Sequence, residues 1–304
     1  MTPAQLEERR TGIGASDIAA VCGIDPWRTQ TDVWIDKMGE GETPDNSAME
    51  WGRRLEEPIA QKYAEETGSL VVMGGLVRHK ELPWIIATPD RLVLDADGTP
   101  RLLLECKTQR NDEGWGRPGS EEIPEHYLCQ VAWQQLASGI AVADVAVLIA
   151  AREFRVYHIG PMDALAAELR ERGEEFWTQH VQTKIRPPFA GGPAEGKWLS
   201  SRYRKHSQEL RYATPEIEQA FGEIQHAKES IEVWETEKAK WENVVKDYIG
   251  SAFGVEGQKG KATWGTTKGR VSWKAVADEL KPSPGLCEKH RGEPYRCFRC
   301  SWES

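Results

Sequence analysis

Residues 87–91 read ATPDR and, after a short turn, residues 102–107 read LLLECK. In a strand, alternate side chains share a face, so Glu105 and Lys107 lie side by side while their neighbours point into the opposite layer. Asp90, at the end of the preceding hairpin, adds a second carboxylate. Two carboxylates supply the oxygen ligands that a hard divalent cation such as Mg²⁺ prefers. The two segments therefore predict a metal site with a lysine beside it.

Lys107 beside the two carboxylates indicates a site that could hydrolyse a phosphate ester. An ammonium group can position a water or help deprotonate it and can offset charge on a phosphate, while the metal polarises the phosphoryl oxygen. The alternative is an exposed Glu–Lys pair on an edge strand, a common pattern in any sheet. The neighbouring segments favour the catalytic interpretation, because the preceding helix offers Glu56 or Glu57 and the following helix offers Gln130.

The flanking sequence predicts an α+β fold with a central mixed sheet. The spacing of apolar residues predicts helices over residues 47–67, 124–138 and 163–183. Short β-branched or leucine-rich runs, separated by Gly, Pro and Asp, predict strands, of which the first four form an antiparallel meander. The expected strands span residues 70–77, 84–88, 91–94, 101–107, 142–150 and 154–159.

The composition excludes several classes of protein. The 304 residues are 39% hydrophobic and 29% charged, which fits a chain that packs a core and excludes a disordered one. Residues 137–151 are too short a run to cross a bilayer and residues 1–10 lack the apolar core of a signal peptide, so we expect a soluble intracellular protein with no membrane partner. The net charge of −9 argues against bulk coating of nucleic acid. A local basic channel can still bind a phosphate backbone, because acidic residues farther away than about 8 Å are screened by salt.

The segment PPFAGGPAEG, residues 187–196, has the proline and glycine content of a linker. We expect it to separate a catalytic core, residues 1–186, from a helical and basic extension, residues 197–280. A small terminal segment, residues 281–304, follows.

The extension contains a long amphipathic helix that begins after Thr214 and Pro215. Its apolar residues repeat every seven positions along two seams. The seams consist of Ile217, Ile224, Ile231 and Val245 and of Ala220, Ala227, Trp234, Trp241 and Tyr248, and Lys238 interrupts the first. Such a helix pairs with another chain or folds as a hairpin against residues 200–212, and we favour the hairpin. Residues 255–274 predict a small β-hairpin.

The terminal segment carries a separate ligand pattern. Its potential ligands are Cys287, His290, Cys297 and Cys300. Four ligands in two closely spaced pairs suit tetrahedral zinc, so we expect a small zinc knuckle. The alternatives are a disordered, reduced tail and a less favoured iron–sulfur cluster, since His290 replaces a thiolate. The remaining cysteines are dispersed, which excludes a disulfide framework.

Near the amino terminus, Ser16 and Asp17 can cap a helix, and a helix start with an arginine nearby is a ready anion site. The alternative is simply a capped helix. Trp27 either stacks on a base or closes the core, and we favour the core.

Four segments occur in the chain order of the PD-(D/E)xK nuclease core: the helix with Glu56, the segments ATPDR and LLLECK, and the helix with Gln130. They resemble that core, and more narrowly the YqaJ-like viral recombinase family, to which the lambda-type exonucleases are related. The opening RTGIGASDIA, residues 10–19, resembles that family's amino-terminal signature, and the resemblance extends over about residues 9–160. The catalytic residues that it implies are Asp90, Glu105, Lys107, Glu56 and Gln130, with Asp90, Glu105 and Glu56 as metal ligands. The phosphate-binding residues that it implies are Arg10, Ser16 and Thr88. We prefer Glu56 to Glu57.

The resemblance also implies an activity: Mg²⁺- or Mn²⁺-dependent hydrolysis of linear duplex DNA from an end, typically of the 5′ strand. It implies phage-type recombination in the bacterial cytoplasm, a single-strand annealing protein as partner and a ring-shaped homo-oligomer around DNA. One departure is Ala132, where the family often has a second glutamine. The alternatives are a structure-specific endonuclease of the same fold and an inactive DNA-binding module that recruits an annealing protein.

Overall fold

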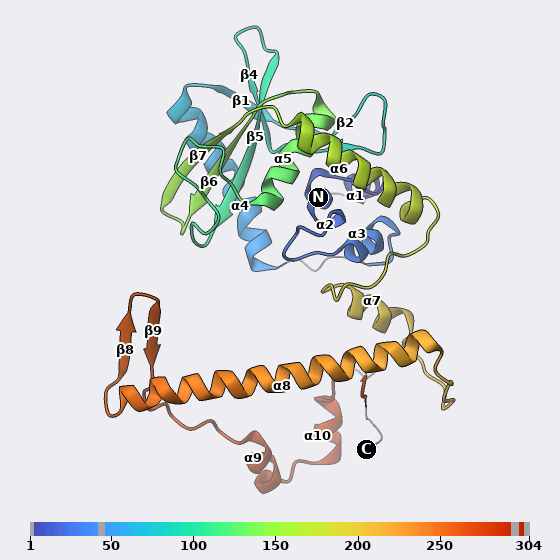
Figure 1. The fold of residues 1–304 in the computed structure, drawn as a ribbon, viewed down its shortest axis with the longest axis vertical. Coiled ribbons are helices and arrows are strands. Elements are labelled where there is room, and N and C mark those ends of the chain that lie inside the picture. Colours follow the sequence, from blue (N-terminus) through green and yellow to red (C-terminus); the bar gives the residue numbers. More distant parts are fainter. Residues whose placement is uncertain (1–2, 42–45, 293–297, 301–304) are drawn as a thin grey trace. The chain divides into compact units, whose positions relative to one another are not determined.

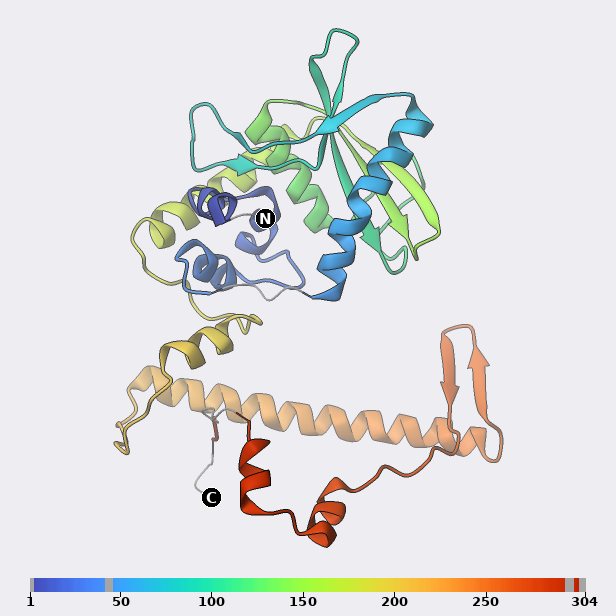
Figure 2. The ribbon, with the colours of Figure 1, turned by 180° about the vertical axis from the view of Figure 1, so that it is seen from behind.

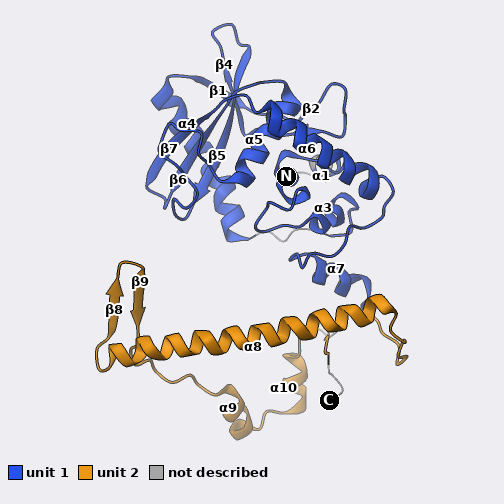
Figure 3. Ribbon diagram, in the orientation of Figure 1, with its two compact units in different colours: residues 1–204 blue, residues 205–304 orange. Residues whose placement is uncertain are grey.

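The computed structural model of the chain describes residues 3–41, 46–292 and 298–300. Its contacts divide the chain into two compact units, Met1–Arg204 and Lys205–Ser304, which Figure 3 shows in different colours. The first unit carries the predicted catalytic residues, and the second carries the long helix.

The first unit is built on a five-stranded mixed sheet in the order β1-β4-β5-β6-β7. The strands are β1 (Leu70–Met73), β4 (Arg91–Leu94), β5 (Pro100–Gln109), β6 (Ala143–Ile149) and β7 (Glu153–Ile159). Within this five-stranded sheet only β5 and β6 pair in parallel, and the chain crosses between them through α5 (Glu125–Ser138), as a parallel pair requires. The mixed sheet with its helices confirms the predicted α+β class.

Helices bury both faces of this sheet. Leu104 of β5 packs with α4 (Ser47–Thr67), whereas Leu103 packs on the other face with Val131 of α5. Figures 1 and 2 show α5 and α4 on opposite sides of the strands. Because side chains alternate along a strand, Glu105 and Lys107 share the α5 face with Leu103. The other helical segments are α1 (Pro3–Arg10), α2 (Ala15–Val21), α3 (Gln30–Lys37), α6 (Asp163–Phe176), a π-helical turn (Trp177–Val181) and α7 (Glu195–Arg202).

The predicted four-stranded meander is wrong in one part. Residues 70–77 divide into β1 and β2 (Val77–Arg78), and β2 pairs only with the short β3 (Ile86–Ala87), outside the main sheet. The division falls at Gly74, whose backbone N–H donates to the carbonyl of Asp90. The chain passes so close to the next segment there that a Cβ on Gly74 would lie 1.9 Å from the Pro89 carbonyl oxygen.

This close approach gives a prediction. We expect Gly74→Ala to lower the free energy of unfolding by about 1–3 kcal/mol, because the added methyl group forces backbone to move. Activity should fall as well, since the displaced Pro89 precedes Asp90. Gly75→Ala is the matched control, because a Cβ there meets no atom within 4 Å. Urea titrations of both variants measure the difference, and equal stability would contradict the proposed contact.

Residues 187–196, expected to be a linker, belong to the first unit instead. The Pro188 carbonyl accepts a hydrogen bond from Thr31 of α3 at 2.7 Å, and the buried Glu195 accepts one from Thr29 at 3.1 Å. Trp198 of α7 is also buried and donates to Glu40. These buried partners, which local composition does not reveal, fix the segment against α3.

The second unit confirms the long helix, α8 (Pro215–Ile249), and the hairpin of β8 (Gly254–Gly257) and β9 (Gly260–Thr263). Two short helices follow, α9 (Trp273–Leu280) and α10 (Pro284–Lys289). The favoured hairpin of α8 with residues 200–212 is wrong, because Leu210 and Tyr212 are almost fully exposed. Across the described parts of both units, none of the helices combines the length and apolar character needed to span a membrane.

Candidate active site

The carboxylate of Glu105 is the centre of a hydrogen-bonded cluster between β5 and α5. It is 3% exposed and accepts hydrogen bonds from Lys107 Nζ at 2.6 Å and from Gln130 Nε2 at 2.5 Å. Lys107 Nζ also donates to Gln130 Oε1 at 2.9 Å. The structure thus brings together three of the predicted catalytic residues.

Gln134 is a member of this cluster that the sequence analysis missed. Its Nε2 donates to the other Glu105 oxygen at 2.7 Å, and the residue is fully buried. Gln134 follows Gln130 by one helical turn, so the spacing of four residues is the signal that identifies it. Ala132, at the position where the family often has a second glutamine, is buried in the core.

Asp90 lies on the strand side of the cluster. Its Oδ2 accepts a hydrogen bond from the Cys106 backbone N–H at 2.8 Å. Burial and the Glu105 carboxylate raise the pKa of Asp90 well above its usual range, although Lys107 opposes the shift. Burial lowers the pKa of Lys107, but Glu105 and Asp90 outweigh that effect and raise it, so the lysine stays protonated. When Asp90 is ionised, two carboxylates share one ammonium, and the site then favours a further cation.

Glu56, the third predicted metal ligand, pairs with an arginine, and no hydrogen bond or ion pair of the described residues joins it to Glu105 or Lys107. Glu56 pairs with Arg91 at 2.5 Å, and Glu57 pairs with the other terminal nitrogen of Arg91 at 2.8 Å. In the described residues, no group of three or more His, Cys, Asp or Glu side chains is arranged to hold a metal ion. Mg²⁺ commonly takes only one or two carboxylates from a protein and fills its shell with water and substrate phosphate. Asp90 and Glu105 fit that requirement without Glu56.

The predicted zinc ligands remain a prediction. Cys297 lies outside the described residues. Cys287 is an exposed residue of α10, His290 follows that helix, and Cys300 is half-buried.

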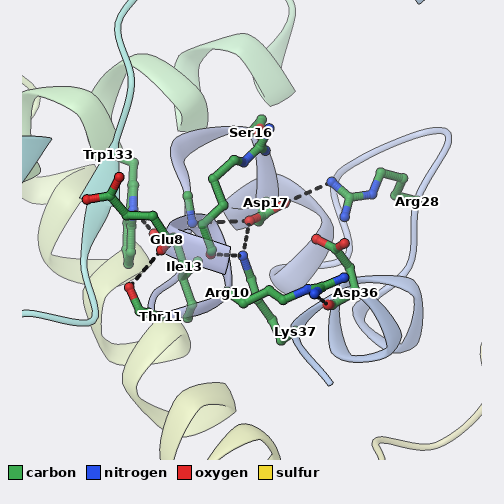
Figure 4. Close-up of polar contacts among 12 residues, drawn as sticks. Glu8, Arg10, Thr11, Ile13, Ser16, Asp17, Arg28, Asp36, Lys37 and Trp133 are labelled. Carbon is green, nitrogen blue, oxygen red and sulfur yellow. Dashed lines mark hydrogen bonds and ion pairs between the residues drawn. The ribbon is translucent and has the colours of Figure 1, made fainter. Parts of the chain in front are cut away.

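At the amino terminus, α2 is fixed by the buried Asp17 (Figure 4). Asp17 accepts from the Gly14 backbone N–H and forms ion pairs with Lys37 at 2.7 Å and Arg28 at 2.9 Å. Burial disfavours the charged carboxylate, but Lys37, Arg28 and Arg9 hold the pKa of Asp17 far below its ordinary value. The start of the helix is therefore held by one backbone hydrogen bond and two ion pairs of the same carboxylate.

Of the two adjacent arginines, the structure brings Arg9 rather than Arg10 to Ser16. Arg9 Nη2 donates to Ser16 Oγ at 2.9 Å. Arg10 instead pairs with Glu7 at 2.5 Å and donates to the Asp36 carbonyl at 3.2 Å. The third predicted phosphate-binding residue, Thr88, is exposed two positions before Asp90.

The amino-terminal segment is tied to the elements that carry the cluster. The carbonyl of Ile13, which Figure 4 shows beside Trp133, accepts a hydrogen bond from Trp133 Nε1 of α5 at 2.9 Å. It accepts another from the Ile86 backbone N–H of β3 at 3.1 Å. These two hydrogen bonds join the segment just before α2 to α5 and to β3.

A row of aromatic residues leads away from the lysine. Lys107 Nζ lies 4.6 Å from the centre of the Tyr127 ring, whose neighbour His126 makes an edge contact with Trp27. Trp27 is 60% exposed, so the expectation that it closes the core is wrong. Its ring belongs to the surface beside the cluster.

Comparisons with known proteins find one matching domain family and several similar chains. The model of the YqaJ-like viral recombinase domain matches residues 5–141. The YqaJ protein of Bacillus subtilis strain 168 is 29% identical over 303 residues, which cover 95% of this chain and 91% of that protein. The crystal structure of an alkaline exonuclease from Laribacter hongkongensis is similar at 23% identity and a TM-score of 0.49, over 60% of this chain and 94% of that one. A phage-related exonuclease from Haemophilus somnus has 12% identity and a TM-score of 0.43, over 57% and 95%. Residues 5–141 thus match a YqaJ-like viral recombinase domain.

Proposed function

We propose that this protein is a Mg²⁺- or Mn²⁺-dependent deoxyribonuclease that degrades linear duplex DNA from an end, beginning with the 5′ strand, during phage-type recombination. The observation that carries the proposal is the joint placement of Asp90, Glu105 and Lys107 along β5, where Asp90 accepts from the Cys106 backbone N–H and Lys107 donates to Glu105. The YqaJ-like domain supports the recombination role.

Asp90 and Glu105 would hold the divalent cation, which supplies a polarised phosphoryl oxygen and a water of lowered pKa. Gln130 and Gln134 donate to both oxygens of Glu105 and so fix the direction in which its lone pairs point. Lys107 is protonated, so it donates hydrogen bonds. Its role is to orient the attacking water and to offset charge on the phosphate, rather than to accept a proton.

Digestion of labelled DNA tests the proposal. Linear duplex carrying a label at either the 5′ or the 3′ end should lose the 5′ label first, while closed circular DNA stays intact. Cutting of circles would favour the structure-specific endonuclease. Binding to DNA ends without any cutting would favour the inactive recruiting module.

The contact between Arg9 and Ser16 gives a prediction about end recognition. We expect Arg9→Ala to reduce the preference for 5′-phosphorylated over 5′-hydroxyl ends about tenfold, because a charge-assisted contact to phosphate contributes about 1.5–3 kcal/mol. Arg10→Ala is the matched control and should change the preference less, since Arg10 is engaged by Glu7. Initial digestion rates on the two kinds of end provide the measurement. A larger effect of Arg10→Ala would return the phosphate-binding role to that residue.

The terminal cysteines and the DNA product each suggest a further binding partner. We propose that Cys287, His290, Cys297 and Cys300 bind one zinc ion, and that a single-strand annealing protein covers the strand that digestion exposes. Metal analysis of the purified chain should find about one zinc per chain. Cys287→Ser should remove it without changing digestion by the core, and a zinc-free wild-type protein would contradict the assignment.

A further inference from the structure

The apolar stripe of α8 lies uncovered in the described part of its own unit. Trp234 is 71% exposed, Trp241 is 56% exposed and Tyr248 is 80% exposed. These residues and the exposed Ile217 and Ile231 occupy the first and fourth positions of successive heptads. Figure 1 shows α8 as one continuous helix, so the heptads form a single stripe along it. A row of large apolar side chains of this kind marks an interaction surface.

We propose that α8 pairs in an antiparallel coiled coil with α8 of a second copy of this chain, centred between Glu232 and Val233. In this register Ile217 faces Tyr248 of the second copy. Ile224 faces the second copy's Trp241, and Ile231 faces its Trp234.

The distribution of side-chain volume along the stripe favours this direction. In the amino-terminal half, the fourth heptad positions carry Ala220 and Ala227, whereas in the carboxyl-terminal half they carry Trp234, Trp241 and Tyr248. An antiparallel pair sets each aromatic residue of one helix opposite an isoleucine of the other and each alanine opposite Val245 or Lys238, so its layers differ less in volume than those of a parallel pair. A parallel pair would set each tryptophan against its own copy and each alanine against an alanine, leaving overfilled and underfilled layers.

The charges along the stripe favour the same direction. In a parallel pair Lys238 would face Lys238 of the second copy across the seam, and Glu237 would lie beside the second copy's Glu242. The antiparallel register places Lys238 opposite the small Ala227 and brings Lys228 beside Glu235 of the second copy. Each direction thus has one attractive pair that occurs twice by symmetry, Lys228 with Glu235 in the antiparallel pair and Lys228 with Glu223 in the parallel one, but the antiparallel register lacks the two repulsive contacts.

The stripe is large enough for a stable contact. It runs from Ile217 to Tyr248, roughly four and a half heptads, which is more than the minimum of about three to four heptads that indicates a coiled coil. Two copies contribute six aromatic side chains, each able to bury about 150–250 Å². These side chains alone approach the roughly 1,000 Å² of a stable interface. The inference depends on α8 only and is independent of the proposed nuclease activity.

The molar mass of the full chain, measured by light scattering over a range of micromolar concentrations, tests the proposal. Wild type should have the mass of two chains. Trp234→Glu should raise the dissociation constant at least about a hundredfold, because it buries a charge in the seam at two symmetric places. Glu229→Lys, on the polar side of α8, is the control that should leave the mass unchanged. A wild-type monomer, or an oligomer that Trp234→Glu leaves intact, would overturn the proposal.

A charge exchange tests the direction of the pair. Lys228→Glu should weaken the dimer about tenfold, and adding Glu235→Lys should restore it, because those two positions meet only in the antiparallel register. In a parallel pair Lys228 would meet Glu223 instead, so restoration by Glu223→Lys and not by Glu235→Lys would contradict the direction proposed. Circular dichroism of each variant verifies that α8 remains helical.

Discussion

Asp90→Asn is expected to reduce Mg²⁺-dependent cleavage of DNA by about a thousandfold or more. The amide still offers an oxygen to the Cys106 backbone N–H, so the local structure is kept, but one of two anionic ligands of the cation is lost. A bound metal supplies several kcal/mol of charge stabilisation, and each 1.4 kcal/mol corresponds to a tenfold change in rate. Single-turnover digestion of linear duplex measures the loss. Glu105→Gln should have a comparable effect.

Two controls separate loss of chemistry from loss of fold. Asp95→Asn removes an exposed carboxylate in the hairpin after β4 and should leave the rate unchanged. Asp90→Asn should also be at least as stable as wild type in EDTA, because it removes repulsion between Asp90 and Glu105. Full activity in Asp90→Asn or Glu105→Gln would contradict the assignment of the site.

The raised pKa of Asp90 gives this site a pH dependence. The cation requires the ionised carboxylate, so protonation competes with metal binding. Mg²⁺ affinity should therefore fall as the pH is lowered from mildly alkaline values through neutrality, well above the pH at which an ordinary aspartate titrates. Isothermal titration with Mg²⁺ at several pH values measures this, and an affinity that is constant down to pH 5 would contradict it.

Asp17→Ala should lower the free energy of unfolding by about 3–5 kcal/mol, the usual cost of breaking a buried ion pair on one side. The side chain of Lys37 is completely buried, and without Asp17 its ammonium loses its counter-charge. Urea unfolding at pH 7 measures the loss. The exposed pair of Glu168 and Arg172 is the matched control, so Glu168→Ala should cost less than about 1 kcal/mol.

The same carboxylate predicts how stability varies with pH. Since the pKa of Asp17 is lower in the folded chain than in the unfolded chain, its contribution is fully present above about pH 4, the unfolded pKa, and is lost as the pH falls further. Asp17→Ala should therefore show a weaker loss of stability in acid than wild type. Parallel pH profiles of the two proteins would contradict the buried pairing.

The alternation of Leu103, Leu104 and Glu105 made it possible to predict the strand and the face of the sheet on which Glu105 and Lys107 lie. Each step along a strand reverses the face, and that rule needs no tertiary information. Gln130 was predictable from the family's order of segments, and Gln134 from its spacing of four residues on the same helix. The face of the strand and the position of Gln134 follow from local periodicity, which can be read from the sequence without tertiary information.

Other features depended on contacts between distant segments. Whether Arg9 or Arg10 turns to Ser16 depends on Glu7 and the Asp36 carbonyl, which capture Arg10. The expected linker at residues 187–196 is held by α3, and neither its prolines nor its glycines indicate that partner. Such choices are decided by tertiary packing, so composition and spacing alone could not make them.

The central claim is that Asp90, Glu105 and Lys107 form a metal-dependent site that degrades DNA from its ends. The most direct test is a time course on linear and closed circular duplex DNA, with Mg²⁺ or EDTA, for wild type and Lys107→Ala. We expect wild type with Mg²⁺ to consume only the linear duplex, and neither EDTA samples nor Lys107→Ala to do so. Equal digestion by Lys107→Ala, or digestion in EDTA, would contradict the claim.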